Sequence, residues 1–216
     1  MQKPKVIFLD AVGTLFGVRG SVGEIYGTFA REYGVQVKDA SLNESFLRAF
    51  TSAKPPVFPG ADPDEIPEQE FEWWRMVALK TFEDAGVLEQ FADFTDFFDQ
   101  LYHQFATAQP WFIYPDVIPA LEKWQAVGIG LGIISNFDSR LNLVLKELKL
   151  DKFFTSVTIS TLTGAAKPEP QIFATALQKH HCQPEEAWHI GDSYQQDYQG
   201  ARAAGLRAIL LDRSAA

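Results

Sequence analysis

The chain has 216 residues, 46% of them hydrophobic, which is enough to bury one sizeable core or one core with a small accessory domain. A formal charge of −9 argues against nucleic acid or an anionic membrane as a partner, because both attract basic surfaces. The single cysteine, Cys182, excludes an internal disulfide, and the first apolar stretch is too short for a signal peptide or a membrane span, so a cytoplasmic protein is predicted.

Five short apolar runs predict buried β-strands. The first, residues 6–9, is rich in β-branched and aromatic side chains and stops at Asp10. Similar runs recur at residues 130–134, 157–160, 187–190 and 208–211. Continuous apolar runs of this kind are typical of parallel strands that are covered on both faces.

Helical patterns separate these runs. Asp138 is the predicted N-cap of a helix in which leucines recur at i, i+4 and i+7 from Leu141 onward. A second helix follows Pro168, and a third ends at Gly205. Strands that alternate with helices predict an α/β fold, in which helices flank a parallel sheet.

The segment 17–110 lacks strand patterns and carries helical periodicity instead. Phe71, Trp74, Ala78 and Phe82 mark one face of a helix that ends near residue 86. We therefore predict a helical module inserted between the first strand and the rest of the sheet. For most of its aromatic side chains the spacing favours a small helical core over the alternative, a substrate pocket.

Polar side chains gather where predicted strands end. Asp10 follows the first strand, a Ser-Asn pair (135–136) follows a later one, Asp192 and Asp197 follow the run at 187–190, and Lys167 precedes a helix. Ligands of an open parallel sheet bind beyond the carboxyl ends of its strands. Because carboxylates are hard oxygen ligands of the kind that Mg²⁺ prefers, the three aspartates predict a magnesium site.

With these motifs the sequence resembles the haloacid-dehalogenase-like hydrolase superfamily, and segments 134–141 and 189–194 look most like its rhythmically-expressed-gene-2-like branch. The resemblance implies a Rossmann-like core formed by residues 1–16 and 111–216, with residues 17–110 as an inserted all-helical cap domain. It also implies a hydrolase, acting as a phosphatase on a small phosphorylated metabolite. A monomer is the default expectation for a capped enzyme of this size.

The resemblance further assigns roles to the acidic residues. Asp10 would attack phosphorus and form an aspartyl-phosphate. Asp10, Asp192 and the main-chain carbonyl of Val12 would bind Mg²⁺, while Asp197 would orient the water molecules around the metal.

Four more residues would handle the phosphoryl group. By the same resemblance, Thr14, Ser135 and Asn136 would hydrogen-bond its oxygens. Lys167 would neutralise its charge and steady the nucleophile.

Val12 departs from the pattern of the phosphatases that the sequence resembles, which carry a second aspartate two residues after the nucleophile. Valine cannot transfer a proton, and general acid–base catalysis contributes about 10²–10⁴-fold to a rate. The sequence therefore predicts a slow phosphatase, one specialised for good leaving groups, or one that uses a cap acid such as Glu24 or Glu72.

Two alternatives remain open. One is a ligand-binding protein that keeps the fold and the metal site without useful turnover. The other is a 2-haloacid dehalogenase, from which halide leaves without a proton. The intact Gly191-Asp192 pair counts against dehalogenation, because that reaction needs no metal and an anionic aspartate would repel a carboxylate substrate.

Two other patterns do not predict sites. The glycines at 128, 130 and 132 lie before and within a strand, whereas a dinucleotide-binding loop lies between strand and helix. His180, His181 and His189 lack partners at zinc-ligand spacing, so we predict structural or surface roles for them.

Overall fold

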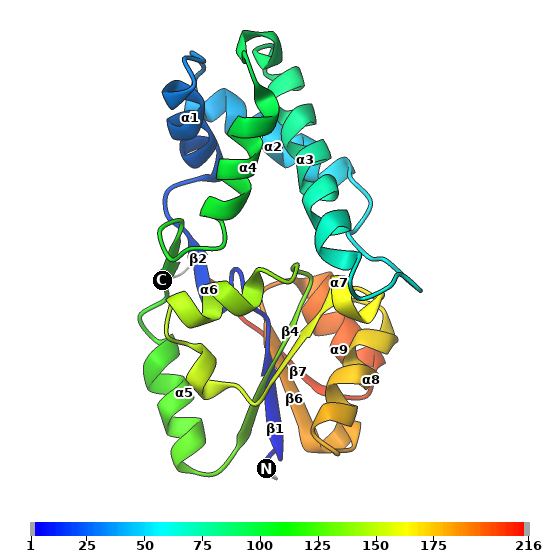
Figure 1. Ribbon diagram of the computed structural model, residues 1–216. Helices are drawn as coiled ribbons and strands as arrows, with labels where there is room; N and C mark the ends of the chain where they lie inside the picture. Colours follow the sequence, from blue (N-terminus) through cyan, green and yellow to red (C-terminus); the bar gives the residue numbers. More distant parts are fainter. Residues whose placement is uncertain (1–2, 214–216) are drawn as a thin grey trace.

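The computed structural model describes residues 3–213 and is centred on a five-stranded sheet in which all neighbouring strands are parallel. The strands are β1 (Val6–Leu9), β4 (Gly130–Ser135), β5 (Ser156–Ile159), β6 (Ala187–Gly191) and β7 (Arg207–Leu210). Their spatial order is β5-β4-β1-β6-β7, so β1 lies in the middle (Figure 1). The predicted α/β fold is confirmed, and each predicted strand agrees with the observed one to within one residue at either end.

The register brings the site-bearing strand ends together. Leu9, the last residue of β1, pairs with Ile133 on β4 and with Ile190 on β6. The chain therefore leaves these three strands at the same edge of the sheet, and Asp10 is the first residue beyond β1.

Alternate side chains of β1 face two separate cores. Ile7 and Leu9 pack with α5 and α6, whereas Val6 and Phe8 pack with α8 and α9 on the opposite face. Burying one such side chain stabilises the fold by roughly 1.5–3 kcal/mol, and a one-residue slip would exchange the two faces. The position of Asp10 is thus fixed by packing. The helices of this core are α5 (Val117–Ala126), α6 (Leu141–Glu147), α7 (Ser160–Thr163), α8 (Pro170–Lys179) and α9 (Gly200–Ala203).

Four helices form a cap above the carboxyl end of the sheet (Figure 1). They enclose their own aromatic core, in which Phe82 and Phe97 are fully buried. No helix within residues 3–213 combines the length and apolar character needed to cross a membrane. The cap helices are α1 (Val22–Glu32), α2 (Asp39–Ser52), α3 (Ile66–Asp84) and α4 (Phe94–Gln104).

A short antiparallel ribbon that the sequence did not indicate connects cap and core. It consists of β2 (Phe16–Val18) and β3 (Trp111–Ile113), in which Gly17 pairs with Phe112. The predicted cap boundary after residue 16 falls inside β2, and the second boundary falls where β3 begins.

Polar contacts also attach α3 directly to the core. Glu70 is fully buried, and its carboxylate accepts hydrogen bonds from the backbone N–H of Ser139 (2.9 Å) and from the hydroxyls of Ser139 and Thr161. The indole nitrogen of Trp74 donates to Asp138 Oδ2 at 2.7 Å. One turn of a cap helix therefore contacts the loop that follows β4.

Three local predictions need correction or refinement. The prediction that Asp138 caps a helix is wrong, because α6 begins at Leu141 and Arg140 takes the N-cap position. The Asp138 carboxylate instead accepts from both the backbone and the guanidinium of Arg140. Ser160, predicted to end a strand, begins α7. The helix before Gly205 opens with a π-helical turn, Tyr194–Gln199. Short 3₁₀ turns lie between the helices and strands at Leu88–Gln90, Asp151–Phe153 and Pro184–Glu186.

Candidate active site

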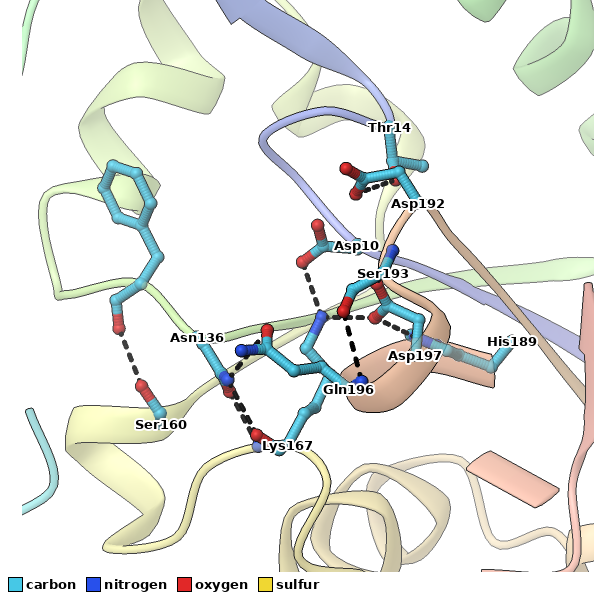
Figure 2. A network of polar contacts seen from close by, with 11 residues as sticks. Asp10, Thr14, Asn136, Ser160, Lys167, His189, Asp192, Ser193, Gln196 and Asp197 are labelled. Carbon is cyan, nitrogen blue, oxygen red and sulfur yellow. Dashed lines mark hydrogen bonds and ion pairs between the residues drawn. The ribbon is translucent and has the colours of Figure 1, made fainter. Parts of the chain in front are cut away.

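A buried lysine lies between two aspartates at the carboxyl end of the sheet. Lys167 Nζ is 2.6 Å from Asp10 Oδ1 and 2.6 Å from Asp197 Oδ1. Lys167 is 3% exposed and Asp197 is 1% exposed, so water screens neither charge well. Figure 2 shows the ammonium group bridging the two carboxylates, which come from the end of β1 and from the π-helical turn. Three segments far apart in the sequence thus form one charged cluster.

The ionisation of this cluster follows from its contacts. Burial alone would lower the pKa of Lys167, but the carboxylates of Asp10 and Asp197 raise it above the usual value. Burial alone would raise the pKa of Asp197, but the hydrogen bond from His189 and the charge of Lys167 hold it well below the usual range. Lys167 is therefore cationic and Asp197 anionic at neutral pH.

Asp192 adds a third carboxylate to the cluster. Oxygens of Asp10, Asp192 and Asp197 all lie within 4.8 Å of one another. Asp192 is exposed as a residue, but its carboxylate is partly buried. This burial and the negative charge of Asp10 raise the pKa of Asp192. Carboxylates placed this closely repel one another unless a cation lies between them. The donor set, all hard oxygens, suits a Mg²⁺ ion.

Gly13 allows Asp192 to approach the loop after β1. Its φ of +86° is one that L side chains rarely adopt, and a Cβ at this position would lie 2.4 Å from Asp192 Oδ2. Thr14 donates a long hydrogen bond of 3.4 Å to Asp192 Oδ1. The Asp192 carboxylate is therefore held over a backbone surface that only glycine provides.

Asp197 is fixed by two further donors. His189 Nε2 is 2.8 Å from Asp197 Oδ1, and the Ser193 N–H donates to Asp197 Oδ2 at 3.0 Å. His189 is fully buried, and burial lowers its pKa, so the ring is neutral and donates from Nε2. At Gly191, a Cβ would lie 2.2 Å from Asp197 Cγ. His189 therefore holds the Asp197 carboxylate in position.

Asn136 contacts the lysine loop in this structure. Its side-chain oxygen accepts from the Lys167 N–H at 2.7 Å, and its Nδ2 donates to the Lys167 carbonyl at 2.9 Å and to Gln196 Oε1 at 3.3 Å (Figure 2). With both ends of the amide engaged, Asn136 holds Lys167 in position. Ser135, the preceding residue, ends β4 and is buried.

An apolar cavity of about 250 Å³ lies next to these residues. Side chains of the cap form most of its wall, including the aromatic Tyr26 and Trp74, while Val12 and Asn136 line it from the core side. Trp73 takes no part in the lining, and its indole nitrogen donates to the Lys54 carbonyl instead. The cavity therefore connects the cap interior with the loops that carry the charged cluster.

Comparison with known proteins identifies the family. A family model described as haloacid dehalogenase-like hydrolase matches residues 4–205. The chain belongs to this family of hydrolases. Haloacid dehalogenase-like hydrolase domain-containing protein 3 of Mus musculus is 36% identical over 209 residues, which are 96% of this chain and 81% of the relative. The rhythmically expressed gene 2 protein of Drosophila melanogaster is 29% identical, over 98% of this chain and 84% of its own. The predicted superfamily and branch are therefore confirmed.

The solved structures that resemble this chain include both phosphatases and dehalogenases. A haloacid-dehalogenase-type phosphatase from Thermococcus onnurineus is 24% identical with a TM-score of 0.62, covering 98% of this chain and 88% of that one. A 2-haloacid dehalogenase from Pseudomonas syringae is 25% identical with a TM-score of 0.62, covering 96% and 86%. Because both classes share the fold of this chain, the fold leaves the reaction open, and the site residues must decide it.

Several residues around the site were not indicated by the sequence. Arg213 donates to the Thr14 carbonyl (2.6 Å) and to Asp116 (2.6 Å), and so ties a distant segment to the loop after β1. Gln196 contacts Asn136. No motif or residue spacing in the sequence indicates the contacts of Arg213 or of Gln196. The acids considered as proton donors, Glu24 and Glu72, are exposed and do not line the cavity, and Glu72 is paired with Arg75.

Proposed function

We propose that this hydrolase is a Mg²⁺-dependent phosphatase that acts on a small phosphorylated compound through an aspartyl-phosphate on Asp10. One observation carries the proposal: the Lys167 ammonium contacts Asp10 and Asp197 at 2.6 Å each, while Asp192 completes a group of carboxylates within 4.8 Å. A nucleophilic carboxylate, a buried cation and a set of metal ligands are thus adjacent, as transfer of an anionic phosphoryl group requires.

Each residue has a definite task in this mechanism. Asp10, Asp192 and the Val12 main-chain carbonyl would hold Mg²⁺, and Asp197 would orient its water molecules. The ion, when bound, supplies positive charge that offsets the repulsion between the carboxylates and the phosphate. Lys167 orients Asp10 through the 2.6 Å contact from its ammonium group, and would neutralise charge on the transferring group.

The remaining polar groups would orient the phosphoryl group and the lysine. Ser135, at the buried end of β4, would donate to a phosphoryl oxygen, and Thr14 would do the same from the loop after β1. Asn136 acts through its two contacts with the Lys167 backbone, which supports a positioning role more than direct phosphate binding. The site residues and the cavity come from one chain, so the proposed activity does not require a second copy.

Dehalogenation of a 2-haloacid fits the site less well. A carboxylate substrate would meet three aspartates, of which two already share the Lys167 ammonium. Among the described residues of the cavity lining, the cationic side chain is that of Arg140, which is paired with Asp138 at 2.7 Å. Like charges at such distances repel strongly in a partly buried site. A phosphate ester bound with Mg²⁺ avoids this repulsion, because the ion adds two positive charges.

The test is release of phosphate from a panel of phosphorylated metabolites and from p-nitrophenyl phosphate, with Mg²⁺ and with excess chelator. We expect turnover that requires Mg²⁺ and is lost in Asp10→Asn, while Asp99→Asn on the outer surface of α4 keeps it. Mg²⁺ binding without release of phosphate from any compound would instead favour a ligand-binding protein. Chloride release from 2-chloropropionate in chelator would show a dehalogenase.

A further inference from the structure

The cavity above the site has the composition of an apolar binding pocket. Its lining consists of apolar and aromatic side chains apart from Asn136 and Arg140, and it includes Val12, two residues after the proposed nucleophile. Small-molecule pockets in proteins are typically of this kind, apolar with a few placed polar groups. Because Val12 and Asn136 belong both to the cavity wall and to the loops of the charged cluster, the cavity is where the organic part of a bound phosphate ester would extend.

Arg140 is not available to bind an anionic organic group. Its Nε and Nη2 donate to the two oxygens of Asp138 at 2.8 and 2.7 Å, and its Nη1 donates to the Tyr102 carbonyl at 2.9 Å. The guanidinium carbon also lies 3.7 Å from the centre of the Tyr102 ring. This arginine is therefore a neutralised part of the wall, and the cavity favours an uncharged occupant.

The cavity also lacks a group that would protonate a leaving oxygen. Within the described lining there is no aspartate, glutamate or histidine, and the two tyrosines, Tyr26 and Tyr102, have pKa values raised mainly by burial. A tyrosine of raised pKa is a poor proton donor at neutral pH. On the cavity side, the leaving oxygen therefore meets no effective proton donor.

The size of the cavity limits the occupant to one or two rings. An engineered apolar cavity of about 150 Å³ in another protein binds benzene. The cavity here, at about 250 Å³, is large enough for a fused pair of rings, and its aromatic walls match such a flat, apolar body.

Building on the proposed phosphatase activity, we propose that the substrate is a phosphate ester of an apolar, ring-sized phenol or enol. Asp10 forms a bond to phosphorus while the bond from phosphorus to the phenolic or enolic oxygen breaks, and that oxygen keeps the electron pair. Water then attacks phosphorus, the bond to Asp10 breaks, and the carboxylate is restored. Solvent carries the proton lost by the water to the released phenoxide or enolate. The products are free phosphate and a phenol or enol.

Three phosphates separate the two requirements of this proposal. The first, 1-naphthyl phosphate, has an apolar body and an acidic leaving oxygen. Acetyl phosphate has the acidic leaving oxygen without the apolar body, and cyclohexyl phosphate has the reverse. At saturating Mg²⁺ we expect the highest kcat/KM for 1-naphthyl phosphate. Acetyl phosphate should show a KM at least about tenfold higher, because a pocket discriminates by about 10-fold or more per missing apolar group. Cyclohexyl phosphate should keep a low KM and lose kcat.

A filled cavity provides the variant test. Val22→Phe, on the cavity wall in α1, should raise the KM for 1-naphthyl phosphate at least about tenfold, and by a larger factor than the KM for acetyl phosphate, which has no apolar body to place in the cavity. Val127→Phe is the matched control: Val127 is 51% exposed at the end of α5, and this variant should change neither substrate. Turnover of acetyl phosphate by Val22→Phe shows at the same time that the variant is folded.

The outcomes distinguish this inference from the proposed function. Equal KM values for 1-naphthyl and acetyl phosphate would refute the proposed substrate class, and so would equal kcat values for 1-naphthyl and cyclohexyl phosphate. Neither result would contradict the proposed phosphatase activity. Phosphate release from none of the three, but from a compound of the metabolite panel, would overturn the substrate class alone, and release from neither set would overturn the phosphatase itself. In that case calorimetry on Asp10→Asn still tests the cavity, because tighter binding of 1-naphthyl phosphate than of methyl phosphate is expected and equal binding would refute it.

Discussion

The buried carboxylate of Glu70 provides a sharp test of how the cap is attached to the core. Glu70→Ala leaves three donors without an acceptor, namely the N–H and hydroxyl of Ser139 and the hydroxyl of Thr161. A hydrogen bond to a charged group contributes about 1.5–3 kcal/mol. Because the three donors share one carboxylate and water can enter the space left behind, we expect a loss of about 3–5 kcal/mol in the free energy of unfolding.

Two further variants calibrate that loss. Glu70→Gln keeps an acceptor oxygen for the Ser139 N–H and Thr161, and its amide can donate to the Ser139 hydroxyl, so a smaller loss of about 1–2 kcal/mol is expected. Glu72→Ala lies two residues along α3, where Glu72 is exposed and contacts Arg75 on the same helix. Its expected cost is below about 1 kcal/mol, as for other surface ion pairs.

Urea unfolding followed by circular dichroism measures all three variants, and hydrogen exchange of α3 shows where the loss occurs. Amides in the first two turns of α3 should lose protection in Glu70→Ala and keep it in Glu72→Ala. A Glu70→Ala protein within about 1 kcal/mol of the unmodified chain would refute the reasoning, because one buried donor and two part-buried donors that lose a shared carboxylate cannot cost so little.

Of three other predictions, two concern the site and one concerns a histidine beside the first residues of β4 and β5. Val12→Asp should raise kcat for cyclohexyl phosphate by up to about 10²-fold and that for 1-naphthyl phosphate far less, because only the alkoxide needs a proton; equal gains in a steady-state assay would contradict this. Gly13→Ala places a Cβ 2.4 Å from Asp192 Oδ2 and should weaken Mg²⁺ binding about 10–100-fold, as measured by calorimetry. Burial lowers the pKa of His180 below its usual 6.5, so the folded state disfavours the protonated ring and stability is lost as the pH falls below that value. In unfolding experiments at pH 7.5 and pH 5.5, His180→Gln should reduce the pH dependence, whereas His103→Gln, an exposed position on α4, should leave it unchanged.

The charged cluster was predictable because it depends on strand ends. The apolar run at 6–9 determines where β1 stops, and parallel pairing with β4 and β6 then brings Asp10 to the same edge as the residues after those strands. Packing on both faces of β1 fixes this register, so few alternative strand registers are possible. The grouping of Asp10, Asp192 and Asp197 within 4.8 Å agrees with that reasoning.

Contacts that depend on side-chain direction in loops were not predictable. Asp138 is a residue type that is common at N-caps, but its carboxylate binds the Arg140 guanidinium, which is a stronger partner than a backbone N–H. The helix therefore starts later, at Leu141. The ribbon of β2 and β3 joins three-residue strands separated by the whole cap, so no local pattern announces it. Glu70 looks like any solvated glutamate on a helix, and only the docking of α3 on the core buries it.

Val12 belongs both to the proposed metal site and to the wall of the cavity. Its main-chain carbonyl would serve the metal, and any amino acid provides that carbonyl equally well. The side chain instead lines the cavity, where an aspartate would add a buried charge beside Asp10 and reduce the apolar surface. The choice of valine therefore concerns the organic part of the substrate rather than the metal. Val12 offers apolar contact where the phosphatases that the sequence resembles carry a proton donor. This difference favours a substrate whose leaving oxygen departs without a proton and whose organic body fills the cavity.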